Sequence, residues 1–319
     1  MPLEMPHPTS LAPQASQLSR VFIVANPGSG RRDPDLFPLI ERTLAEDSDQ
    51  HKLAVADDGA DLTKLAKSAI DQGYDTVVAA GGDGTIAAVA QALFDAHQSG
   101  QTPPSLGVIP LGTFNYVARS LNLPLEDPET ATRTLLSGTP SPFALGEVNG
   151  KVFLNNASLG AYPAILDQRE DIYRRYGRSR VAAYWSVLRT LSTLRYPLSL
   201  QIDVDGKAIR RKSALAFIAN SSYQIEQFDL PGAEDVRKGK FAVYVAPDTG
   251  RYRLILSAIR LAGRRAQLGR DMEMVTGSSV TIETRQKSRL IARDGEKEKM
   301  SGPFRFRIHT DALKVICPT

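Results

Sequence analysis

An acidic residue lies inside a glycine-rich turn, Gly-Gly-Asp-Gly-Thr at residues 81–85, between an apolar run and a helix-like stretch. Glycine lets a backbone approach a ligand closely, and the first N–H groups of a helix attract anions. A phosphate would therefore suit this turn, although the carboxylate of Asp83 would repel it. A divalent cation on the phosphate would remove that repulsion.

Two further glycine-containing loops follow apolar runs, Asn-Pro-Gly-Ser-Gly at residues 26–30 and Leu-Gly-Thr at residues 111–113. Ligands of open α/β sheets bind beyond the carboxyl ends of the strands, so three such loops indicate an extended polyphosphate. Neither common phosphate motif fits. The pattern G-x-x-x-x-G-K-[ST] is absent, and Asp33 stands where the dinucleotide fingerprint needs a third glycine. For residues 28–30, a plain tight turn remains an equal alternative.

A second acid, in Asp294-Gly295-Glu296, follows the apolar stretch "RLIA". Phosphoryl transfer to a hydroxyl needs a base for the hydroxyl proton, and a carboxylate can serve. By itself, however, Asp-Gly between two strands favours a hairpin turn, which is also the interpretation of Asp205-Gly206. No G-x-S-x-G motif occurs and no histidine lies in a motif, so no nucleophilic triad is indicated.

Strand-like and helix-like stretches alternate four times in the first part of the chain, which predicts a doubly wound parallel α/β sheet. After about residue 140, short strands and the hairpin signal Asn149-Gly150 predict a second, β-rich domain of antiparallel, sandwich-like strands. The expected organisation is a disordered tail at 1–19, an α/β domain at 20–140 and a β-rich domain at 141–302, with the strands at 303–319 as candidates to return to the first domain.

The composition sets limits on the class of protein. The chain has 319 residues, of which 42% are hydrophobic and 23% charged, as in a globular protein. Its one cysteine excludes an internal disulfide, and its four scattered histidines make a zinc site improbable. The first twenty residues lack the apolar core of a signal peptide, and no apolar run reaches the length of a membrane span. We therefore expect a cytoplasmic protein.

Basic charge is concentrated in two segments, residues 172–195 and 251–270, which hold six arginines each and no acid. Removing these twelve charges from the net charge of +4 leaves −8 for the remainder. One interpretation is that apolar stripes in both segments (Leu254, Ala258, Leu261 and Ala262 in the second) pack on the β-rich domain while the arginines stay solvated. The other is docking of the arginines on an anionic bilayer. No DNA-binding motif accompanies them, so no nucleic acid partner is expected.

The ordered set of motifs "NPGSG", "GGDGTIAAV", "PLGTFNYVAR", "FLNNASLGAY" and "IARDGE" resembles the diacylglycerol kinase catalytic family, which includes bacterial soluble lipid kinases and is related to sphingosine and ceramide kinases. The resemblance covers about residues 21–316. It implies that ATP, accompanied by Mg²⁺, binds the first domain, that Asp83 lies near the metal, and that Asp294 is the catalytic base, assisted by Glu296. The ATP-binding residues it implies are Asn26, Gly28, Gly81, Gly82, Asp83, Gly84, Thr85, Gly112, Thr113 and Asn115. For Asp83, capping of the helix that it begins is an additional role.

Two positions depart from the family pattern. Tyr116 stands where the family usually has an aspartate, so the acceptor, or the way it is held, can differ from diacylglycerol. Lys238 stands where bacterial members often have an acid that helps to hold a structural Mg²⁺. Since a lysine cannot ligate a cation and Asp235 alone is weak evidence, that structural metal is not expected here.

The resulting prediction is an ATP- and Mg²⁺-dependent lipid kinase that phosphorylates the hydroxyl of a diacylglycerol-like or sphingoid lipid at the inner membrane surface. In this scheme the first domain binds ATP, and the β-rich domain contacts the lipid. NAD kinase is the enzyme alternative, because it shares the glycine turn. A nucleotide- or lipid-binding regulator without turnover is the non-enzyme alternative. The oligomeric state stays open, with a homodimer as one candidate.

Overall fold

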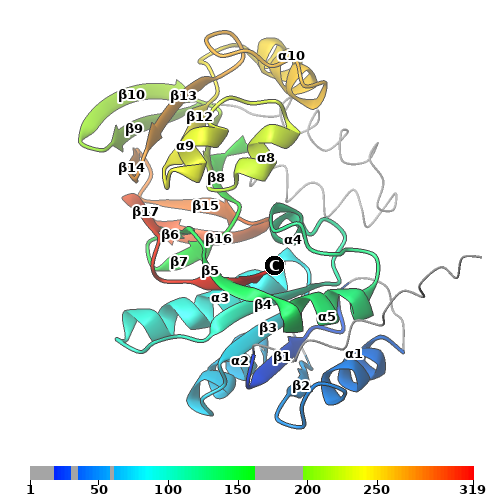
Figure 1. The fold of residues 1–319 in the computed structure, drawn as a ribbon. Helices are drawn as coiled ribbons and strands as arrows, with labels where there is room; N and C mark the ends of the chain where they lie inside the picture. Colours follow the sequence, from blue (N-terminus) through cyan, green and yellow to red (C-terminus); the bar gives the residue numbers. More distant parts are fainter. Residues whose placement is uncertain (1–17, 30–34, 58–60, 162–196) are drawn as a thin grey trace, which may run out of the picture.

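A computed structural model of the chain describes residues 18–29, 35–57, 61–161 and 197–319 (Figure 1). Most of the expected N-terminal tail, Gly30, and the first arginine-rich segment, 172–195, lie outside the described residues. Among the residues that are described, no helix is both long enough and apolar enough to cross a membrane.

The first domain is built on a six-stranded sheet that is parallel except at one edge. Its inner strand β1 (Val21–Ala25) is buried along its whole length, as expected for a parallel strand that is covered on both faces. The C-terminal strand β18 pairs parallel to β4 and antiparallel to β5, which makes that edge mixed. In spatial order the strands are β2 (Lys52–Val55), β1, β3 (Thr76–Gly81), β4 (Ser105–Pro110), β18 (Lys314–Cys317) and β5 (Thr139–Pro142).

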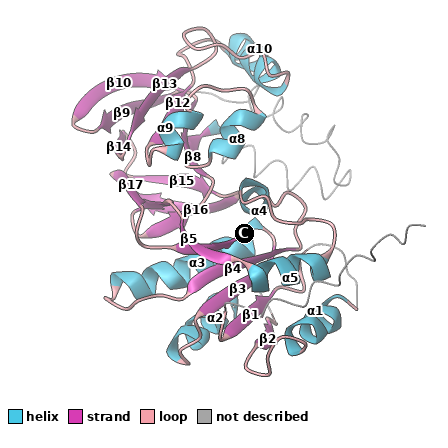
Figure 2. Cartoon of the chain, viewed as in Figure 1, coloured by secondary structure: helices cyan, strands magenta, loops and turns pink. Residues whose placement is uncertain are grey.

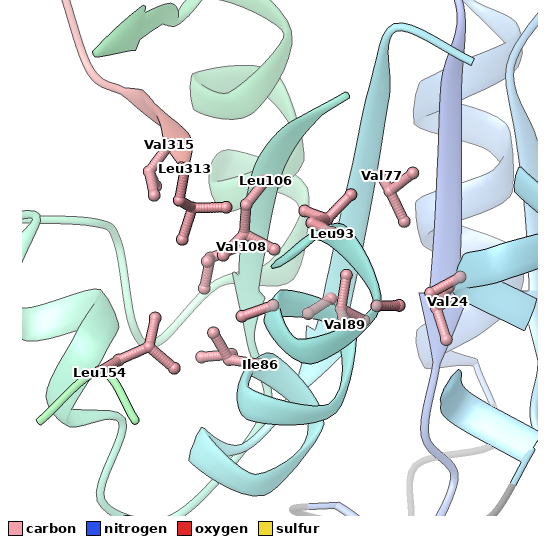
Figure 3. Close-up of a cluster of buried hydrophobic side chains, with 14 of the residues drawn as sticks. Val24, Val77, Ile86, Val89, Leu93, Leu106, Val108, Leu154, Leu313 and Val315 are labelled. Carbon is pink, nitrogen blue, oxygen red and sulfur yellow. The ribbon is translucent and has the colours of Figure 1, made fainter. Parts of the chain in front are cut away.

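Helices cover both faces of this sheet (Figure 2), which confirms the doubly wound α/β class. The alternation of side chains along β1 explains the two layers, because Val24 faces one core and Ile23 the other. Helices α2 (Asp61–Asp71) and α3 (Asp83–Gln98) pack on the Val24 side, whose buried cluster is shown in Figure 3. Helices α1 (Leu36–Ala45) and α5 (Pro128–Ser137) pack on the Ile23 side.

The second domain is a sandwich of two six-stranded sheets, and all of its named strand pairs are antiparallel. One buried cluster contains Phe304 and Ile202 from one sheet with Phe241 and Ile218 from the other, so the sheets pack face to face. This arrangement confirms the β-rich antiparallel prediction. One sheet has the order β10 (Lys207–Ser213), β9 (Leu198–Val204), β14 (Ser279–Thr284), β17 (Phe304–His309), β6 (Leu145–Val148) and β7 (Lys151–Phe153). The other has the order β13 (Glu273–Gly277), β12 (Phe241–Val245), β11 (Leu215–Ala219), β8 (Asn156–Gly160), β15 (Ser288–Arg293) and β16 (Glu296–Ser301).

A sharp change of direction between β7 and β8 carries the chain from one sheet of the sandwich to the other. β6 and β7 form the expected hairpin, in which Asn149 and Gly150 both have positive φ, 48° and 83°. The chain then bends at Leu154 and Asn155 and continues as β8 in the opposite sheet. The Leu154 side chain remains in the core of the first domain (Figure 3), so the bend lies where the two domains meet.

Helix α3 connects the two domains directly. The Gln91 side chain donates to the Gly150 carbonyl at 3.1 Å and accepts from the Val152 N–H at 2.9 Å. Phe94 contacts the ring of His309 edge to face, with ring centroids 4.9 Å apart. The helix that begins at the glycine turn is therefore fixed to the hairpin that leads into the bend.

Short helices lie over the outer face of the second sheet of the sandwich. Helices α8 (Ser222–Gln227) and α9 (Ala233–Arg237) contribute Ile225 and Val236 to a small buried cluster there. Helix α10 (Arg251–Ala262) lies at the end of this domain remote from the α/β sheet (Figure 1). Unlike the other two, α10 contains no fully buried residue. A further short helix, α4 (Tyr116–Ser120), follows β4 in the first domain.

Candidate active site

The glycine turn is sterically locked at the carboxyl end of β3. A Cβ at Gly81 would lie 2.3 Å from the Thr85 hydroxyl oxygen, and a Cβ at Gly112 would lie 2.5 Å from the Gly82 Cα. Only glycine therefore lets the 81–85 and 111–113 loops touch. Gly82 precedes α3 without a side-chain cap, so the first N–H groups of this helix are not covered by a capping side chain. The resulting surface can therefore bind an anion through backbone N–H groups.

Side chains from the first loop hold the glycine turn in place. The Asn26 amide donates to the Thr85 hydroxyl at 2.9 Å and accepts from the Gly28 N–H at 2.9 Å. The Ser29 hydroxyl accepts from the Gly82 N–H at 3.3 Å. The structure thus brings residues 26–29 of the first loop together with the 81–85 turn, and Gly30 lies outside the described residues. Ser29 is thus a further residue of the site, and its signal in the sequence is its place between two glycines in "NPGSG".

Two residues predicted to bind ATP lie behind the loop surface. Thr85 is buried, with its hydroxyl bonded to Asn26 rather than directed outward. Asn115 is also buried, and its amide bonds both the N–H and the carbonyl of Gly112. In the structure the Thr85 hydroxyl joins two loops through Asn26, and its contact with a phosphate stays a prediction. By contrast, Gly84 and Thr113 are exposed on the loop surface.

Asp83 caps a helix, but not the helix that it begins. Its two carboxylate oxygens accept from the N–H groups of Tyr116 and Val117, at 3.2 and 3.1 Å, which lie at the start of α4. The expected cap of its own helix is therefore wrong, since Gly82 holds that position without a side-chain bond. The carboxylate instead fixes α4 against the glycine turn. Part of the Asp83 residue stays exposed, so its remaining lone pairs can face the site.

Asp294 lies in a hairpin turn, and its carboxylate bonds to backbone N–H groups of a distant segment. Asp294 and Gly295 connect β15 to β16 with positive φ values of 46° and 89°. The Asp294 carboxylate accepts three backbone N–H groups from the bend after β7, those of Leu154 at 2.7 Å, Asn155 at 2.8 Å and Asn156 at 3.1 Å. The sequence analysis did not identify these three donors, because a backbone donor has no residue signature.

The surroundings of Asp294 favour its neutral form more than water does. Burial raises the pKa of the Asp294 carboxyl from 3.8 to about 6. The three backbone N–H groups lower this pKa, and the negative charge of Asp83 raises it. The influence of Asp83 indicates that the two acids identified from sequence, 211 positions apart in the chain, lie near enough for the charge of one to act on the other. A carboxylate with a pKa near 6 is a stronger base than an ordinary aspartate and is still ionised at neutral pH.

Glu296 also reaches the glycine turn. It is exposed as the first residue of β16, and a Cβ placed on Gly84 would lie 3.6 Å from its Oε1 atom. The loop that carries Asp294 therefore lies directly over the start of α3. A polar layer supports this loop from behind, where the Asn156 amide donates to Gln224 at 2.9 Å. The Asn156 Oδ1 atom is buried, with no hydrogen-bond partner among the described residues.

Tyr116 and Lys238, the two departures from the family pattern, each lie beside specific side chains in the structure. Tyr116 stacks on the exposed ring of Phe114, with centroids 5.9 Å apart, at the start of α4. Lys240 lies 3.7 Å from the Asp235 carboxylate, and Lys238 lies 3.8 Å from that of Glu234. Lysines thus face both acids at the position where a structural Mg²⁺ was considered. In the described part of the chain, no group of three or more His, Cys, Asp or Glu residues could hold a metal ion.

Comparison with known proteins places these features in a family. Residues 20–148 match the model of the diacylglycerol kinase catalytic domain. Residues 160–317 match the YegS C-terminal NAD kinase beta sandwich-like domain. The first match contains the glycine turn, and the second contains Asp294 and Glu296.

Several relatives carry kinase names. The chain is 32% identical to a diacylglycerol kinase of Bacillus subtilis over 63% of this chain and 65% of that protein. It is 46% identical to a "Probable lipid kinase YegS-like" of Pseudomonas aeruginosa over 31% of each chain. The aligned part is thus less than two thirds of either relative.

The same architecture occurs in a solved structure. A crystal structure of a diacylglycerol kinase from Bacillus anthracis superimposes with a TM-score of 0.71 over 95% of this chain and 98% of that one, at 19% identity, and so shares the fold. The two family matches together lead to one conclusion: the chain carries a diacylglycerol kinase catalytic domain at residues 20–148, followed by a YegS-type C-terminal domain at residues 160–317.

Proposed function

We propose that the protein is an ATP- and Mg²⁺-dependent lipid kinase that transfers the γ-phosphoryl group of ATP to a lipid hydroxyl. The observation that carries this proposal is the Asp294 carboxylate, which three backbone N–H groups hold opposite the glycine turn. A phosphate on the turn and a hydroxyl beside Asp294 would meet at the boundary between the two domains.

The first domain is suited to hold the nucleotide phosphates. Gly81 and Gly112 allow a close backbone approach that a Cβ would block, and the N-terminus of α3 carries partial positive charge. Asn26, Thr85 and Asn115 keep the loops in this shape by bonding to one another or to backbone. In the proposed complex, Gly28, Gly82, Gly84 and Thr113 form the surface of the loops against ATP.

The described residues fit a Mg²⁺ that arrives with the nucleotide. Mg²⁺ keeps several waters and is commonly bound by one or two carboxylates together with substrate phosphates. The part of the chain that the structure describes offers no cluster of three ligand side chains, whereas Asp83 lies at the glycine turn with lone pairs left over. Mg²⁺ bound there would neutralise phosphate charge, and Asp83 would orient it directly or through water.

Asp294 is the proposed base. As the acceptor oxygen forms its bond to the γ-phosphorus, the hydroxyl proton passes to the Asp294 carboxylate and ADP leaves with the electrons of the broken P–O bond. The three N–H donors fix the position of the carboxylate before the substrate binds. Glu296, beside Gly84, is proposed to orient the base or the metal-bound phosphates.

The acceptor is proposed to be a diacylglycerol-like or sphingoid lipid, reached at an anionic membrane surface on the cytoplasmic side. Within 251–270 the arginines outnumber acids six to none, which favours an anionic surface. The β-rich domain, about 141–302, would contact the lipid, and the α/β domain, about 20–140, would bind ATP.

Transfer of labelled phosphate from ATP to a panel of lipids in mixed micelles tests the proposal. Wild type is expected to label one lipid class only when Mg²⁺ is present, and Asp294→Asn is expected to lose about 10²- to 10⁴-fold in turnover. Absence of any labelled lipid with folded wild type, or unchanged turnover of Asp294→Asn, would overturn it. Binding of ATP and liposomes without transfer would indicate the regulator alternative.

NAD kinase is the second candidate, favoured by one observation: the model matched by residues 160–317 is described as NAD kinase beta sandwich-like. Incubation with NAD and ATP distinguishes the two enzymes, because an NAD kinase forms NADP without any lipid. The lipid kinase proposal predicts no NADP above the level of Asp294→Asn.

A further inference from the structure

Helix α10 carries a second apolar stripe that faces away from the protein. Tyr252 is 84% exposed, Leu256 44% and Ile259 56%. These residues are spaced by four and three, so they lie on one face of the helix. The stripe expected from sequence is a different one. Of its four residues, Leu254 and Ala258 are half-buried, Leu261 packs against the small cluster under α8 and α9, and Ala262 is exposed.

Cations border the outer stripe. With 3.6 residues per turn, Arg251 and Arg253 lie on opposite flanks of the line through Tyr252 and Leu256. Among the described residues, Arg253 and the exposed Arg264 and Arg265 just past the helix have no ion-pair partner. Two other arginines of the segment are engaged elsewhere, because Arg260 and Arg270 bind the buried carboxylate of Asp271 at 3.0 and 2.7 Å.

An anionic lipid bilayer matches this combination of features. Tyrosine and aliphatic side chains in a row, flanked by arginines, are typical of helices that lie in the interface of a membrane with their apolar face in the lipid. A second copy of this chain is a poor occupant, because two such faces would bring arginines against arginines with no acid between them. Arg260 and Ser257 of α10 bond to Asp271 in the connection to β13, and Leu261 packs against the sandwich, so both contacts tie the helix to this domain.

We propose that Tyr252, Leu256 and Ile259, with Arg253 and the cations that follow the helix, form the membrane-docking face of the protein. This inference deepens the proposed lipid kinase function, on which its purpose rests, by naming the surface that meets the bilayer. The apolar stripe enters the interface, and the arginines pair with anionic headgroups. The docking itself needs no catalysis and can be measured without it.

Co-sedimentation with vesicles tests the docking face. Wild type is expected to bind vesicles of phosphatidylglycerol and phosphatidylcholine, and to bind pure phosphatidylcholine weakly. The triple variant Tyr252→Ser, Leu256→Ser, Ile259→Ser is expected to bind the anionic vesicles about tenfold or more weakly. Val55→Ser is the matched control, because Val55 is an apolar side chain of similar exposure, 46%, in the first domain. Equal binding by the triple variant and wild type would overturn the proposal.

Further measurements separate docking from folding and from self-association. Because the stripe is exposed, the triple variant should keep the melting temperature and elution volume of wild type. A fall of several degrees, or loss of a dimer with unchanged vesicle binding, would show that protein covers the stripe and would overturn the proposal. As a single-site probe, Leu256→Trp should be quenched by brominated phosphatidylcholine in anionic vesicles more strongly than wild type or Val55→Trp. Equal quenching counts against docking.

Phosphoryl transfer distinguishes failure of this inference from failure of the proposed function. With dioctanoylglycerol in neutral detergent micelles, the triple variant should match wild type, whereas with the same lipid in anionic vesicles it should be slower by about the factor lost in binding. If wild type phosphorylates dioctanoylglycerol in neither preparation, a diacylglycerol-like acceptor is ruled out, and the vesicle binding measurements still decide the docking face.

Discussion

Two Asp-Gly turns of the sandwich have almost the same backbone and different surroundings. Asp205-Gly206 and Asp294-Gly295 each join adjacent antiparallel strands, with φ of 48° and 83° in the first and 46° and 89° in the second. Each carboxylate also accepts backbone N–H groups of a neighbouring segment, which are those of Ser278 and Ser279 for Asp205. The turn geometry is therefore a property of the hairpin and does not indicate catalysis.

What distinguishes the two turns is the surface that each one meets. Asp294 lies against the bend between β7 and β8, where the two domains meet, and burial and the charge of Asp83 raise its pKa to about 6 there. The segment bonded to Asp205 is the connection between β13 and β14, within the sandwich itself. The same Asp-Gly turn therefore offers a candidate catalytic base only where the fold places its carboxylate near a glycine-rich loop that can bind phosphate.

The largest effect is expected from removing each carboxylate in turn. Asp294→Ala should lower kcat/KM by about 10²- to 10⁴-fold, since the base is lost. Asp205→Ala should leave kcat/KM within about twofold and lower stability by about 0.5–1.5 kcal/mol, because its N–H partners return to water. Lipid phosphorylation and urea unfolding measure the two effects. Equal losses of activity in the two variants would remove the distinction between the turns.

The pH dependence of kcat/KM should reflect the raised pKa of the Asp294 carboxyl. A base must be ionised, and its folded-state pKa is raised to about 6, so kcat/KM should be level above that pH and fall about tenfold per pH unit below it. Asp205→Ala should leave this acid limb in place. An acid limb near pH 4 in wild type would mean that the carboxyl of the base has an ordinary pKa.

A smaller effect is expected at the residues that follow the two turns. Glu296 and Lys207 occupy equivalent positions at the start of β16 and β10, and both are exposed. Glu296→Gln should lower kcat by about three- to tenfold, because the carboxylate beside Gly84 loses its charge at the phosphate loop. Lys207→Gln should have no effect on kcat. Steady-state kinetics with saturating ATP compares them, and a larger loss in Lys207→Gln would contradict the assignment.

The smallest effect is expected at the glycines of the turns. Gly206 and Gly295 have φ of 83° and 89°, and an added Cβ at either would meet nothing within 4 Å. Alanine at either position should therefore lower the free energy of unfolding by about 1 kcal/mol through backbone strain alone. Of the two, only Gly295→Ala should also lower activity, by shifting Asp294. Chemical denaturation paired with the lipid assay separates the contributions.

The sequence predicted the layers of the fold because these depend on local periodicity. The fourfold alternation of strand-like and helix-like stretches predicted the doubly wound parallel sheet, and the Asn149-Gly150 signal predicted its hairpin. The buried roles of Thr85 and Asn115 could not be predicted. Thr85 bonds to the side chain of Asn26 in another loop, and Asn115 bonds to the backbone of Gly112. Side-chain periodicity carries no information about such contacts.

Residue types alone determined that this chain has acids within and near glycine turns, that two segments are strongly cationic, and that an α/β half precedes a β-rich half. Only the tertiary structure decided that Asp83 lies near enough to Asp294 to raise its pKa, that Asp83 caps α4, and that α10 turns an apolar stripe outward. The physical reason is the range of the forces involved. Backbone preference and side-chain periodicity act over a few residues, whereas burial and charge proximity exist only after distant segments have packed together.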